Sequence, residues 1–301
     1  MTKQLAVGFL YAISPVLAED LLHPAGESRS EQTQGGFKLS ETVSAKPEIG
    51  KTFRAVLSDA KLWRSIIETL STTVDQANFV FTTKGMSVRA MDPIRVEMVD
   101  FELSKDAFED YQCNSDMRLG INLDGMGKVM RRAAAGDSLE LVLDEKNNRL
   151  LTRFRGKSVR TFSLSLLDLG SEELPTPKVE FKALAKLTAE AIGEAIKDAG
   201  VVSDQVKVTL KPDMLMMKAS GDTGDALVEF RKGSEALLDL EVKEESTAIY
   251  ALNYLNDMMK AGSISETAIL QISTNMPLRM DFLISSGGRI TYFLAPRRES
   301  D

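Results

Sequence analysis

The sequence has very few of the residues from which most catalytic and metal sites are built. Its 301 residues include one cysteine, Cys113, and one histidine, His23. A single cysteine excludes an internal disulfide, and these two residues supply no His/Cys metal cluster and no Ser–His or Cys–His pair. We therefore expect no metal and no other cofactor. Only carboxylates or lysines remain for any enzymatic chemistry.

The chain also lacks an excess of positive charge, and it is poor in aromatic residues. Lysine and arginine number 37 against 44 aspartates and glutamates, which gives a net charge of -7, and 6% of the residues are aromatic. An acidic chain binds nucleic acid only if its basic residues gather on one face. Without an aromatic platform or a groove-reading helix motif, any DNA contact is expected to involve the backbone alone.

No apolar run that we identify is long enough to cross a bilayer. The run Leu5–Ala18 imitates a secretory signal but is too short for a membrane span. Residues 19–50 are rich in Ser, Glu, Gln, Thr, Pro and Gly, which predicts disorder. Three interpretations stay open for residues 1–50: a true signal, a tail that folds on a partner, or an upstream start before a domain that begins near Lys51. The last two together are favoured, so we expect a disordered N-terminal extension or a mis-assigned start.

An acidic stretch with two prolines divides the chain. Residues 167–180, LDLGSEELPTPKVE, contain Pro175 and Pro177, which remove two backbone donors and favour an extended chain. On each side of this stretch a helix is followed by strands, a second helix and further strands. This order predicts an α+β fold with an internal duplication. The expected parts are a domain at 51–166, an interdomain connector at 167–180, a second domain at 181–298 and a tail at 299–301.

Each half is expected to present helices on one face and an antiparallel sheet on the other. Ser58 and Asp59 can cap a first helix, in which apolar residues recur at helical spacing: Leu62, Trp63, Ile66, Ile67 and Leu70. The same spacing predicts helices at 124–135, 187–199 and 248–260. Five basic residues of the first half fall outside the apolar stripes: Lys61, Arg64, Lys128, Arg131 and Arg132. In the second half Lys186, Lys197 and Lys260 are mixed with acids. Two interpretations stay open for these residues: a face that attracts phosphates, or ordinary solvated helix surfaces.

Several short motifs resemble one known family. They are Met91-Asp92-Pro93, NLDGMGKVMRR at 122–132, LLDLGSEELPTP at 166–177, ALNYLNDMMKAG at 251–262, NMPLRMDF at 275–282 and TYFLAPRRE at 291–299. Together they resemble the sliding clamps of archaea and eukaryotes, the proliferating cell nuclear antigen (PCNA) family. The resemblance runs from about Lys51 to Arg298, and residues 1–50 have no counterpart in it.

The resemblance implies a protein that performs no chemistry and acts as a polymerase processivity factor. In that family three two-domain subunits close head to tail into a ring around double-stranded DNA, with helices lining the hole. The implied partners are DNA, without sequence preference, and DNA polymerase, clamp loader, flap endonuclease and ligase through short aromatic motifs. Self-association or pairing with related clamp subunits is implied, with no membrane partner. The implied location is cytoplasmic and nucleoid-associated, or nuclear in a eukaryote.

Motif matching to the family gives two sets of expected site residues. The DNA-facing set is Lys61, Arg64, Lys128, Arg131, Arg132, Lys197 and Lys260. The partner-pocket set, under the interdomain connector, is Met91, Arg95, Met98, Leu169, Leu174, Met276, Pro277, Tyr292, Ala295 and Pro296. The edge strands that would join subunits are expected at Ser115–Asn122 and Ala226–Arg231.

Two alternative functions stay open at this point. One is a subunit of a heteromeric or checkpoint-type clamp. The other, less favoured, is a carboxylate-based hydrolase that uses Glu172/Glu173 or Asp137/Glu140 as acid and base. Such an enzyme needs two carboxyls in one pocket whose pKa values are pushed apart.

Overall fold

The computed structural model describes residues 51–171, 174–222 and 224–297. The expectations for residues 1–50, for the pair Glu172/Glu173 and for the tail at 299–301 lie outside the described residues. Within the described part, the first half carries two α-helices on a set of antiparallel strands. Its elements are β1 Phe53–Leu57, α2 Ala60–Leu70, β2 Gln76–Thr82, β3 Gly85–Met91, β4 Glu97–Ser104, β5 Asp110–Cys113, β6 Met117–Asn122, α3 Leu123–Met130, β7 Ser138–Asp144, β8 Arg149–Arg155 and β9 Val159–Ser165.

The second half repeats this order of elements. They are β10 Ala183–Thr188, α4 Ala189–Gly200, β11 Gln205–Lys211, β12 Met214–Gly221, β13 Gly224–Arg231, β14 Leu237–Val242, β15 Ser246–Ala251, α5 Leu252–Met258, β16 Thr267–Ile272, β17 Leu278–Ile284 and β18 Gly288–Leu294. Three short 3-10 helices complete the described elements: η2 Lys105–Ala107, η3 Glu145–Asn147 and η4 Met259–Ser263.

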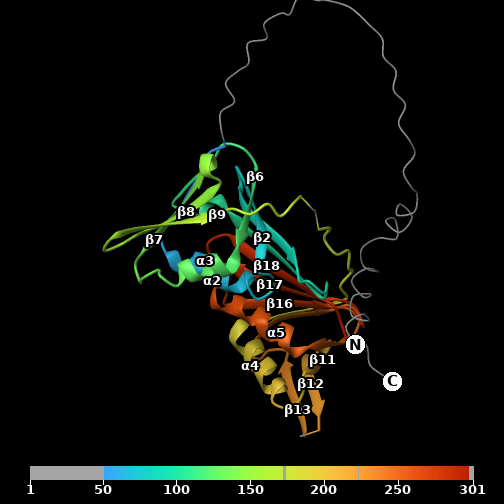
Figure 1. Ribbon diagram of the computed structural model, residues 1–301. Helices are drawn as coiled ribbons and strands as arrows, with labels where there is room; N and C mark the ends of the chain where they lie inside the picture. Colours follow the sequence, from blue (N-terminus) through green and yellow to red (C-terminus); the bar gives the residue numbers. More distant parts are fainter. Residues whose placement is uncertain (1–50, 172–173, 223, 298–301) are drawn as a thin grey trace, which may run out of the picture.

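The strands form three antiparallel sheets whose orders reveal the duplication. A five-stranded sheet has the order β5-β1-β7-β8-β9, and a four-stranded sheet has the order β13-β12-β11-β15. The third, nine-stranded sheet runs β14-β10-β16-β17-β18-β4-β3-β2-β6. Its first five strands repeat the order of the five-stranded sheet, and its last four repeat the order of the four-stranded sheet. The predicted α+β duplication is therefore confirmed, and helices lie on one side of the sheets (Figure 1).

The two halves are joined by a continuous strand pairing. β18 of the second half pairs antiparallel with β4 of the first, from Gly288 opposite Leu103 to Leu294 opposite Glu97. Backbone hydrogen bonds therefore cross the boundary between the halves, and the nine-stranded sheet is shared by both. The sequence predicted a sheet in each half but not this shared sheet, because periodicity identifies strands without identifying their neighbours.

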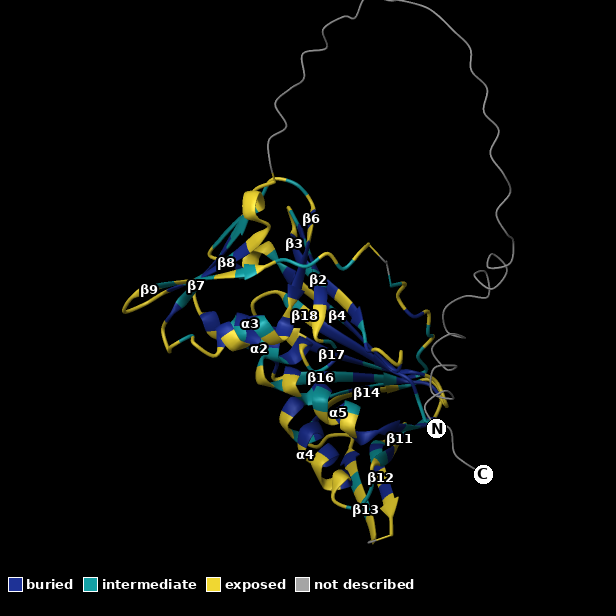
Figure 2. Ribbon diagram, viewed as in Figure 1, coloured by how far each residue is buried: buried dark blue, intermediate teal, exposed yellow. Residues whose placement is uncertain are grey.

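The core lies between the helices and the inner faces of the sheets (Figure 2). In α2 the apolar positions Trp63, Ile66, Ile67 and Leu70 are each 0% exposed, as their helical spacing predicted. This helix begins after Asp59, whose side chain accepts a hydrogen bond from the Lys61 backbone nitrogen at 2.8 Å. Such an N-cap satisfies a backbone donor that has no partner inside the helix. The single cysteine, Cys113, is partly buried at the end of β5.

Two predicted helices are shorter than expected. The helix predicted at 124–135 ends at Met130, with Arg131 as its C-cap, so Arg132 lies in the following turn. The Asp137 carboxylate accepts a hydrogen bond from the Ala134 nitrogen at 2.6 Å, which holds a non-helical bend. The helix predicted at 248–260 begins later than expected. Ser246–Ala251 is strand β15, and helix α5 starts at Leu252. Thr247, Ile249 and Tyr250 favour a strand, and pairing with β11 satisfies their backbone groups.

Candidate functional site

The helices that carry the expected basic residues form one continuous layer. α2 packs against α3, α4 packs against α5, and α2 also contacts η4, which continues α5. Figure 1 shows α3, α2, α5 and α4 following one another along the same side of the molecule. The sequence placed the basic residues on separate helices, and the fold brings those helices together on one surface, which we call the helical face.

Four of the expected cations on the helical face are paired with acids of their own helical segment. Arg64 pairs with Glu68 at 2.8 Å, Lys128 with Asp124 at 2.6 Å, Lys197 with Glu194 at 2.7 Å and Lys260 with Asp257 at 3.2 Å. All these side chains are substantially exposed, and exposed pairs of this kind contribute little net stability. An incoming anion can therefore displace the carboxylate from such a pair at a small cost in free energy. It must nevertheless compete with that carboxylate for the cation.

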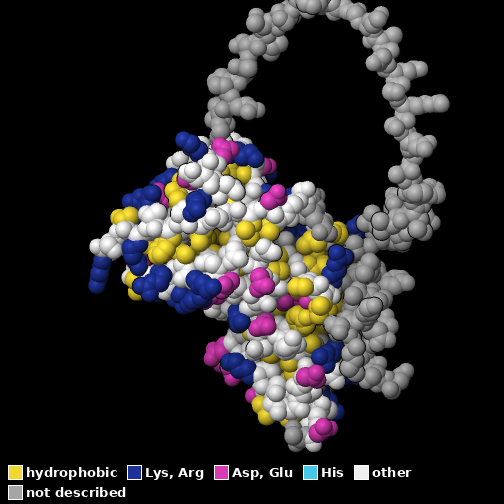
Figure 3. Space-filling view, viewed as in Figure 1, with side chains coloured by type: hydrophobic (Ala, Val, Ile, Leu, Met, Phe, Trp, Pro, Cys, Tyr) yellow, Lys and Arg dark blue, Asp and Glu magenta, His cyan; other side chains and the backbone are white. Residues whose placement is uncertain are grey.

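The other three expected cations, Lys61, Arg131 and Arg132, are exposed and have no ion pair within the part of the chain that the structure describes. Arg131 and Arg132 stand at the C-terminal end of α3, where the helix dipole favours positive charge. The Arg132 carbonyl accepts a hydrogen bond from Arg160 Nη1 at 2.7 Å, which anchors this turn on β9. Figure 3 shows dark-blue side chains gathered around the α3 end of the molecule.

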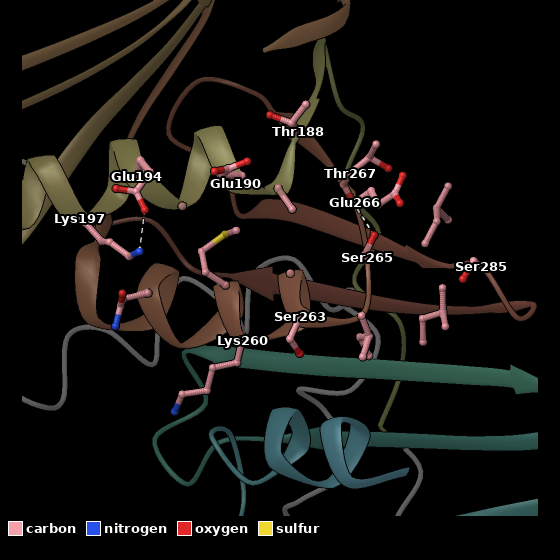
Figure 4. A pocket seen from close by; sticks show the side chains of 18 residues that line it. Thr188, Glu190, Glu194, Lys197, Lys260, Ser263, Ser265, Glu266, Thr267 and Ser285 are labelled. Carbon is pink, nitrogen blue, oxygen red and sulfur yellow. Dashed lines mark hydrogen bonds and ion pairs between the residues drawn. The ribbon is translucent and has the colours of Figure 1, made fainter. Parts of the chain in front are cut away.

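The second half presents a more acidic surface on the same face. A groove of about 1100 Å³ lies between α4 and η4, and Glu190, Glu194 and Glu266 line it together with Lys197 and Lys260. Figure 4 shows Lys197 turned back toward Glu194 along the wall of this groove. The mixture of acids and bases expected from the sequence is therefore a real surface feature, and the local charge is less positive here than at the end of α3.

The interdomain connector is fixed to the outer side of the first half by three hydrogen bonds. The Leu167 nitrogen donates to the Gly120 carbonyl at 2.8 Å, Asn78 Nδ2 to the Gly170 carbonyl at 3.0 Å, and Arg89 Nη1 to the Leu174 carbonyl at 3.1 Å. Of these sheet residues, Asn78 lies on β2, Arg89 on β3 and Gly120 on β6. The connector therefore crosses this part of the nine-stranded sheet at fixed points.

A pocket of about 700 Å³ lies between this connector and the sheet. We call it the connector pocket. Four of the predicted partner-pocket residues line it: Met91, Arg95, Leu169 and Leu174. Val80, Pro93 and Arg118 also line it and were missed. The alternation of β2 could have indicated Val80, because its neighbours Phe79 and Phe81 are 0% exposed and Val80 must face the other way.

The remaining predicted pocket residues do not line this pocket. Tyr292 is 0% exposed and packs edge-on against Phe282, with ring centroids 6.2 Å apart, so it belongs to the core. Met98 is also 0% exposed, although it lies directly opposite Met91 in the sheet. Pro277 is buried and Ala295 is 2% exposed, whereas Met276 and Pro296 keep some exposure. These residues were matched by motif, and a motif gives no information about burial.

A buried acidic turn next to the connector pocket was not predicted. Asp92 Oδ1 accepts hydrogen bonds from the nitrogens of Val96 at 2.6 Å and Glu97 at 2.8 Å, and Tyr254 of α5 donates to Asp92 Oδ2 at 3.3 Å. Glu97 is 1% exposed, and burial raises the pKa of its carboxyl to about 8. The turn therefore joins the first half to α5 of the second half through protonatable groups.

The acid pair Asp137/Glu140 does not have the properties of an acid–base pair. Asp137 is ion-paired with Arg160, whereas Glu140 binds Arg54 and Arg153 at 2.7 Å each and Arg155 at 2.8 Å. Burial alone would raise the pKa of Glu140, but hydrogen bonds from these arginines outweigh it and hold that pKa at about 2. A general acid needs a raised pKa, so this pair gives no support to a hydrolase.

The described residues contain neither a cluster of metal-ligand side chains nor a helix that could span a membrane. Across 51–171, 174–222 and 224–297, no group of three or more His, Cys, Asp or Glu side chains is arranged to hold a metal ion. In the same ranges no helix is both long enough and apolar enough to span a bilayer.

Comparisons with known proteins agree with the fold and with the motifs. The profile of the N-terminal domain of proliferating cell nuclear antigen matches residues 52–173, and the C-terminal profile matches residues 175–297. The DNA polymerase sliding clamp 1 of Thermococcus kodakarensis is 39% identical over 247 residues, which are 82% of this chain and 99% of that protein. The DNA polymerase sliding clamp of Thermofilum pendens is 37% identical over 245 residues, 81% of this chain and 98% of that protein.

Solved structures show the same similarity in three dimensions. The crystal structure of PCNA from Thermococcus kodakaraensis superposes with a TM-score of 0.78 at 29% identity, covering 82% of this chain and 100% of that one. The Entamoeba histolytica PCNA structure, at 24% identity and a TM-score of 0.77, supports the fold alone and covers 83% of this chain and 100% of that one. With both domain profiles matched and relatives aligned over nearly their whole length, the chain belongs to the proliferating cell nuclear antigen family.

Proposed function

We propose that the chain is a DNA polymerase sliding clamp, a subunit of a ring that encircles duplex DNA and holds polymerase on it. Family membership supports this function directly. The structure adds a physical reason, because the pairing of β18 with β4 is a junction that the duplicated fold can repeat between subunits. That repeatable junction is the observation on which the proposal of a ring rests.

Ring closure follows from the matching strand orders of the two halves. β9 stands in the first half where β18 stands in the second, and β13 stands where β4 stands. The intrachain junction uses β18 and β4, and the strand order leaves β9 and β13 at free sheet edges. Repeating the same pairing between chains joins β9 of one subunit to β13 of the next and gives a head-to-tail contact.

The residue register of this contact can be transferred from the intrachain junction. The row Ala55, Leu141, Thr152, Phe162 across the first sheet matches the row Ala185, Leu270, Met280, Tyr292 across the second. Since Tyr292 lies opposite Val99, the equivalent partner of Phe162 is Ala226, and Thr161 then lies opposite Leu227. Val159 is 62% exposed and Leu227 is 54% exposed, so closure would cover two apolar side chains that now face water.

This assignment keeps one of the two strands expected from the sequence and replaces the other. β13 includes the expected range Ala226–Arg231. The expected range Ser115–Asn122 contains β6, which is terminal in the nine-stranded sheet, but its Gly120 carbonyl is already bonded by Leu167 of the connector. We therefore propose β9 as the first-half partner, because its edge has no neighbouring strand in the described chain.

The helical face is the proposed DNA-facing surface of the ring. Lys61, Arg131 and Arg132 are the proposed main phosphate contacts, and the paired residues Arg64, Lys128, Lys197 and Lys260 are secondary contacts. Phosphate contacts carry no base information, so binding is expected to be independent of sequence and to weaken with salt.

The connector pocket is the proposed site for a short aromatic motif of the polymerase and, by the same route, of clamp loader, flap endonuclease and ligase. Covering its apolar wall of Met91, Leu169 and Leu174 with an aromatic turn would contribute on the order of 3–6 kcal/mol before ordering costs, which leaves micromolar affinity. Leu174→Asp should abolish calorimetric binding of a C-terminal peptide of the cognate polymerase without affecting ring formation. Equal affinity in wild type and variant would contradict the assignment of the pocket.

The function itself is tested by topology rather than by affinity. We expect a clamp loaded on a nicked circle to survive moderate salt, and to be lost when the circle is cut to a linear molecule. Tight, sequence-dependent binding to short linear duplex would contradict the proposal. The particle mass separates a homotrimer of this chain from the alternative of a heteromeric clamp, since the heteromer would require related subunits to reach three.

A further inference from the structure

We propose that the connector pocket binds the chain's own N-terminal apolar segment, residues 5–13, and that this segment competes with external partner motifs. The inference rests on the proposed partner site and adds a regulator carried in the same chain. The family profiles begin at residue 52, so nothing in the family match assigns a role to this segment. Three observations support it: the chemistry of the segment, the chemistry of the pocket and the length of chain between them.

The segment has the composition of a pocket ligand. Residues 5–13, LAVGFLYAI, contain no charged side chain and carry three large apolar residues in succession, Phe9, Leu10 and Tyr11. Pro15 follows shortly after and limits any regular structure that begins before it. Burying an uncharged run with two aromatic residues against another apolar surface is favourable. The same run is an aggregation hazard when it is exposed to water.

The connector pocket has an apolar wall within a lining that also contains charged residues, among them Arg95, Asp100 and Arg118. Met91, Leu169 and Leu174 supply apolar wall from two different segments, and Arg89 and Asn78 hold the connector in place through its backbone. The pocket therefore does not depend on a partner to bring its walls together. Its volume of about 700 Å³ is large enough to accept two aromatic side chains.

The described chain begins close to this pocket. The Thr52 nitrogen donates to Asn114 Oδ1 at 2.9 Å, and Arg118, four residues later, lines the pocket. Four residues span at most about 14 Å. The segment is joined to Lys51 by residues 14–50. A flexible chain of the same number of residues reaches about 35 Å, so this length is enough to span the gap. A tether of this kind gives an effective concentration on the order of 1 mM.

This effective concentration predicts the size of the competition. If the untethered segment binds with a dissociation constant on the order of 100 µM, the tethered segment fills the pocket about ten times as often as it leaves it empty. An external motif then binds the full chain about tenfold more weakly than a chain that lacks residues 1–50. Because the segment is part of the same particle, the difference should not change when the protein is diluted.

The experiment measures two peptides against matched proteins by fluorescence anisotropy. A labelled peptide of residues 1–18 is titrated with the chain lacking residues 1–50, with the same protein carrying Leu174→Asp, and with one carrying Leu283→Asp. Leu283 is 44% exposed and lines a separate groove, so it serves as the control. We expect binding that Leu174→Asp weakens at least tenfold and that Leu283→Asp leaves unchanged.

The second arm uses the full chain and a C-terminal peptide of the cognate polymerase. Its affinity should rise about tenfold on removal of residues 1–50, and by a similar factor in the full-length double variant Phe9→Ala/Tyr11→Ala. The control Val16→Ala/Leu17→Ala removes apolar atoms beyond Pro15 and should leave the affinity at the wild-type level. Equal affinity of the full and shortened chains would overturn the inference.

The possible outcomes separate the inference from the proposed function. If the polymerase peptide binds and the 1–18 peptide does not, the inference fails and the partner site stands. If neither peptide binds, the proposed partner site fails as well. If the 1–18 peptide binds but loses affinity with Leu283→Asp instead of Leu174→Asp, it occupies another groove and the inference is overturned.

Discussion

Glu97→Gln should make the protein more stable at pH 8 and remove part of its pH dependence. Glu97 begins β4, at the junction of the two halves, and is 1% exposed. Its Oε1 atom has no hydrogen-bond partner among the described residues. Burial, together with the nearby carboxylates of Asp92 and Asp257, raises the pKa of Glu97 from 4.5 to about 8. The folded protein therefore holds a proton that the unfolded chain releases near pH 4.5.

The sign and size of the effect follow from proton linkage. Below pH 4.5 both states carry the proton and Glu97 costs nothing, whereas between pH 4.5 and about 8 the folded state alone carries it. The free energy of unfolding must then fall as pH rises through this window, by on the order of 3–5 kcal/mol at 1.36 kcal/mol per pKa unit. Glutamine has the same shape and no charge, so the variant should lose this slope and gain a similar amount of stability at pH 8.

Urea unfolding between pH 4.5 and 8.5 measures this difference. Trp63 is 0% exposed in the first-half core and reports unfolding by fluorescence. Protein concentration must be held constant, because ring assembly adds to the apparent stability. Glu102→Gln, on the same strand but exposed, is the control and should keep the wild-type slope. Equal pH slopes for wild type and Glu97→Gln would refute the conclusion that Glu97 is protonated in the folded protein.

Three further predictions follow from the ion pairs and the free edges. Glu140, whose pKa is held at about 2 by three arginines despite its burial, contributes stability that is complete above pH 4.5 and is lost as pH falls toward 2; Glu140→Gln should therefore cost about 2–3 kcal/mol at pH 7 and little at pH 2, as measured by thermal unfolding. Reversal of Lys61, Arg131 and Arg132 to Glu should leave the melting temperature within a few degrees of wild type and reduce loader-dependent retention on circular DNA, and unchanged retention would mean that the helical face is only solvated surface. Leu227→Asp should yield monomers in light scattering while Leu238→Asp, at a comparable 48% exposure on β14, keeps the ring; a trimeric Leu227→Asp would show that β13 is not the closing strand.

The sequence predicted the local elements well wherever one periodicity dominated. The helical stripe of Trp63, Ile66, Ile67 and Leu70 is buried as predicted. The prediction from the sequence was wrong where a strand is followed directly by a helix, as at β15 and α5. There Ala251 caps the helix without a side-chain hydrogen bond, so the sequence carries no capping signal.

The candidate sites were predictable only in part, for a related reason. Leu169 and Leu174 are apolar residues on an acidic connector, which is a local signal, and both line the pocket. Tyr292 and Met98 looked similar in their motifs but are covered by residues far away in sequence, which no local pattern reveals. The buried pair Asp92 and Glu97 gave no signal either, because its partner Tyr254 comes from the other half of the chain.

The acidic balance of the chain bears on how a ring of this kind would hold DNA. A net charge of -7 repels DNA at a distance, and on the proposed DNA-facing surface Arg64, Lys128, Lys197 and Lys260 are already paired with acids. A phosphate that approaches one of these cations must displace the carboxylate already paired with it. The net binding free energy per contact is therefore small. Among the seven proposed contacts, Lys61, Arg131 and Arg132 have no ion pair in the described chain and would bind a phosphate without first losing a carboxylate. Weak contacts of this kind would let DNA pass from one set of cations to the next with low barriers, and retention would then depend on closure of the ring at β9 and β13, so that weakening the edge should release DNA sooner than weakening any single cation.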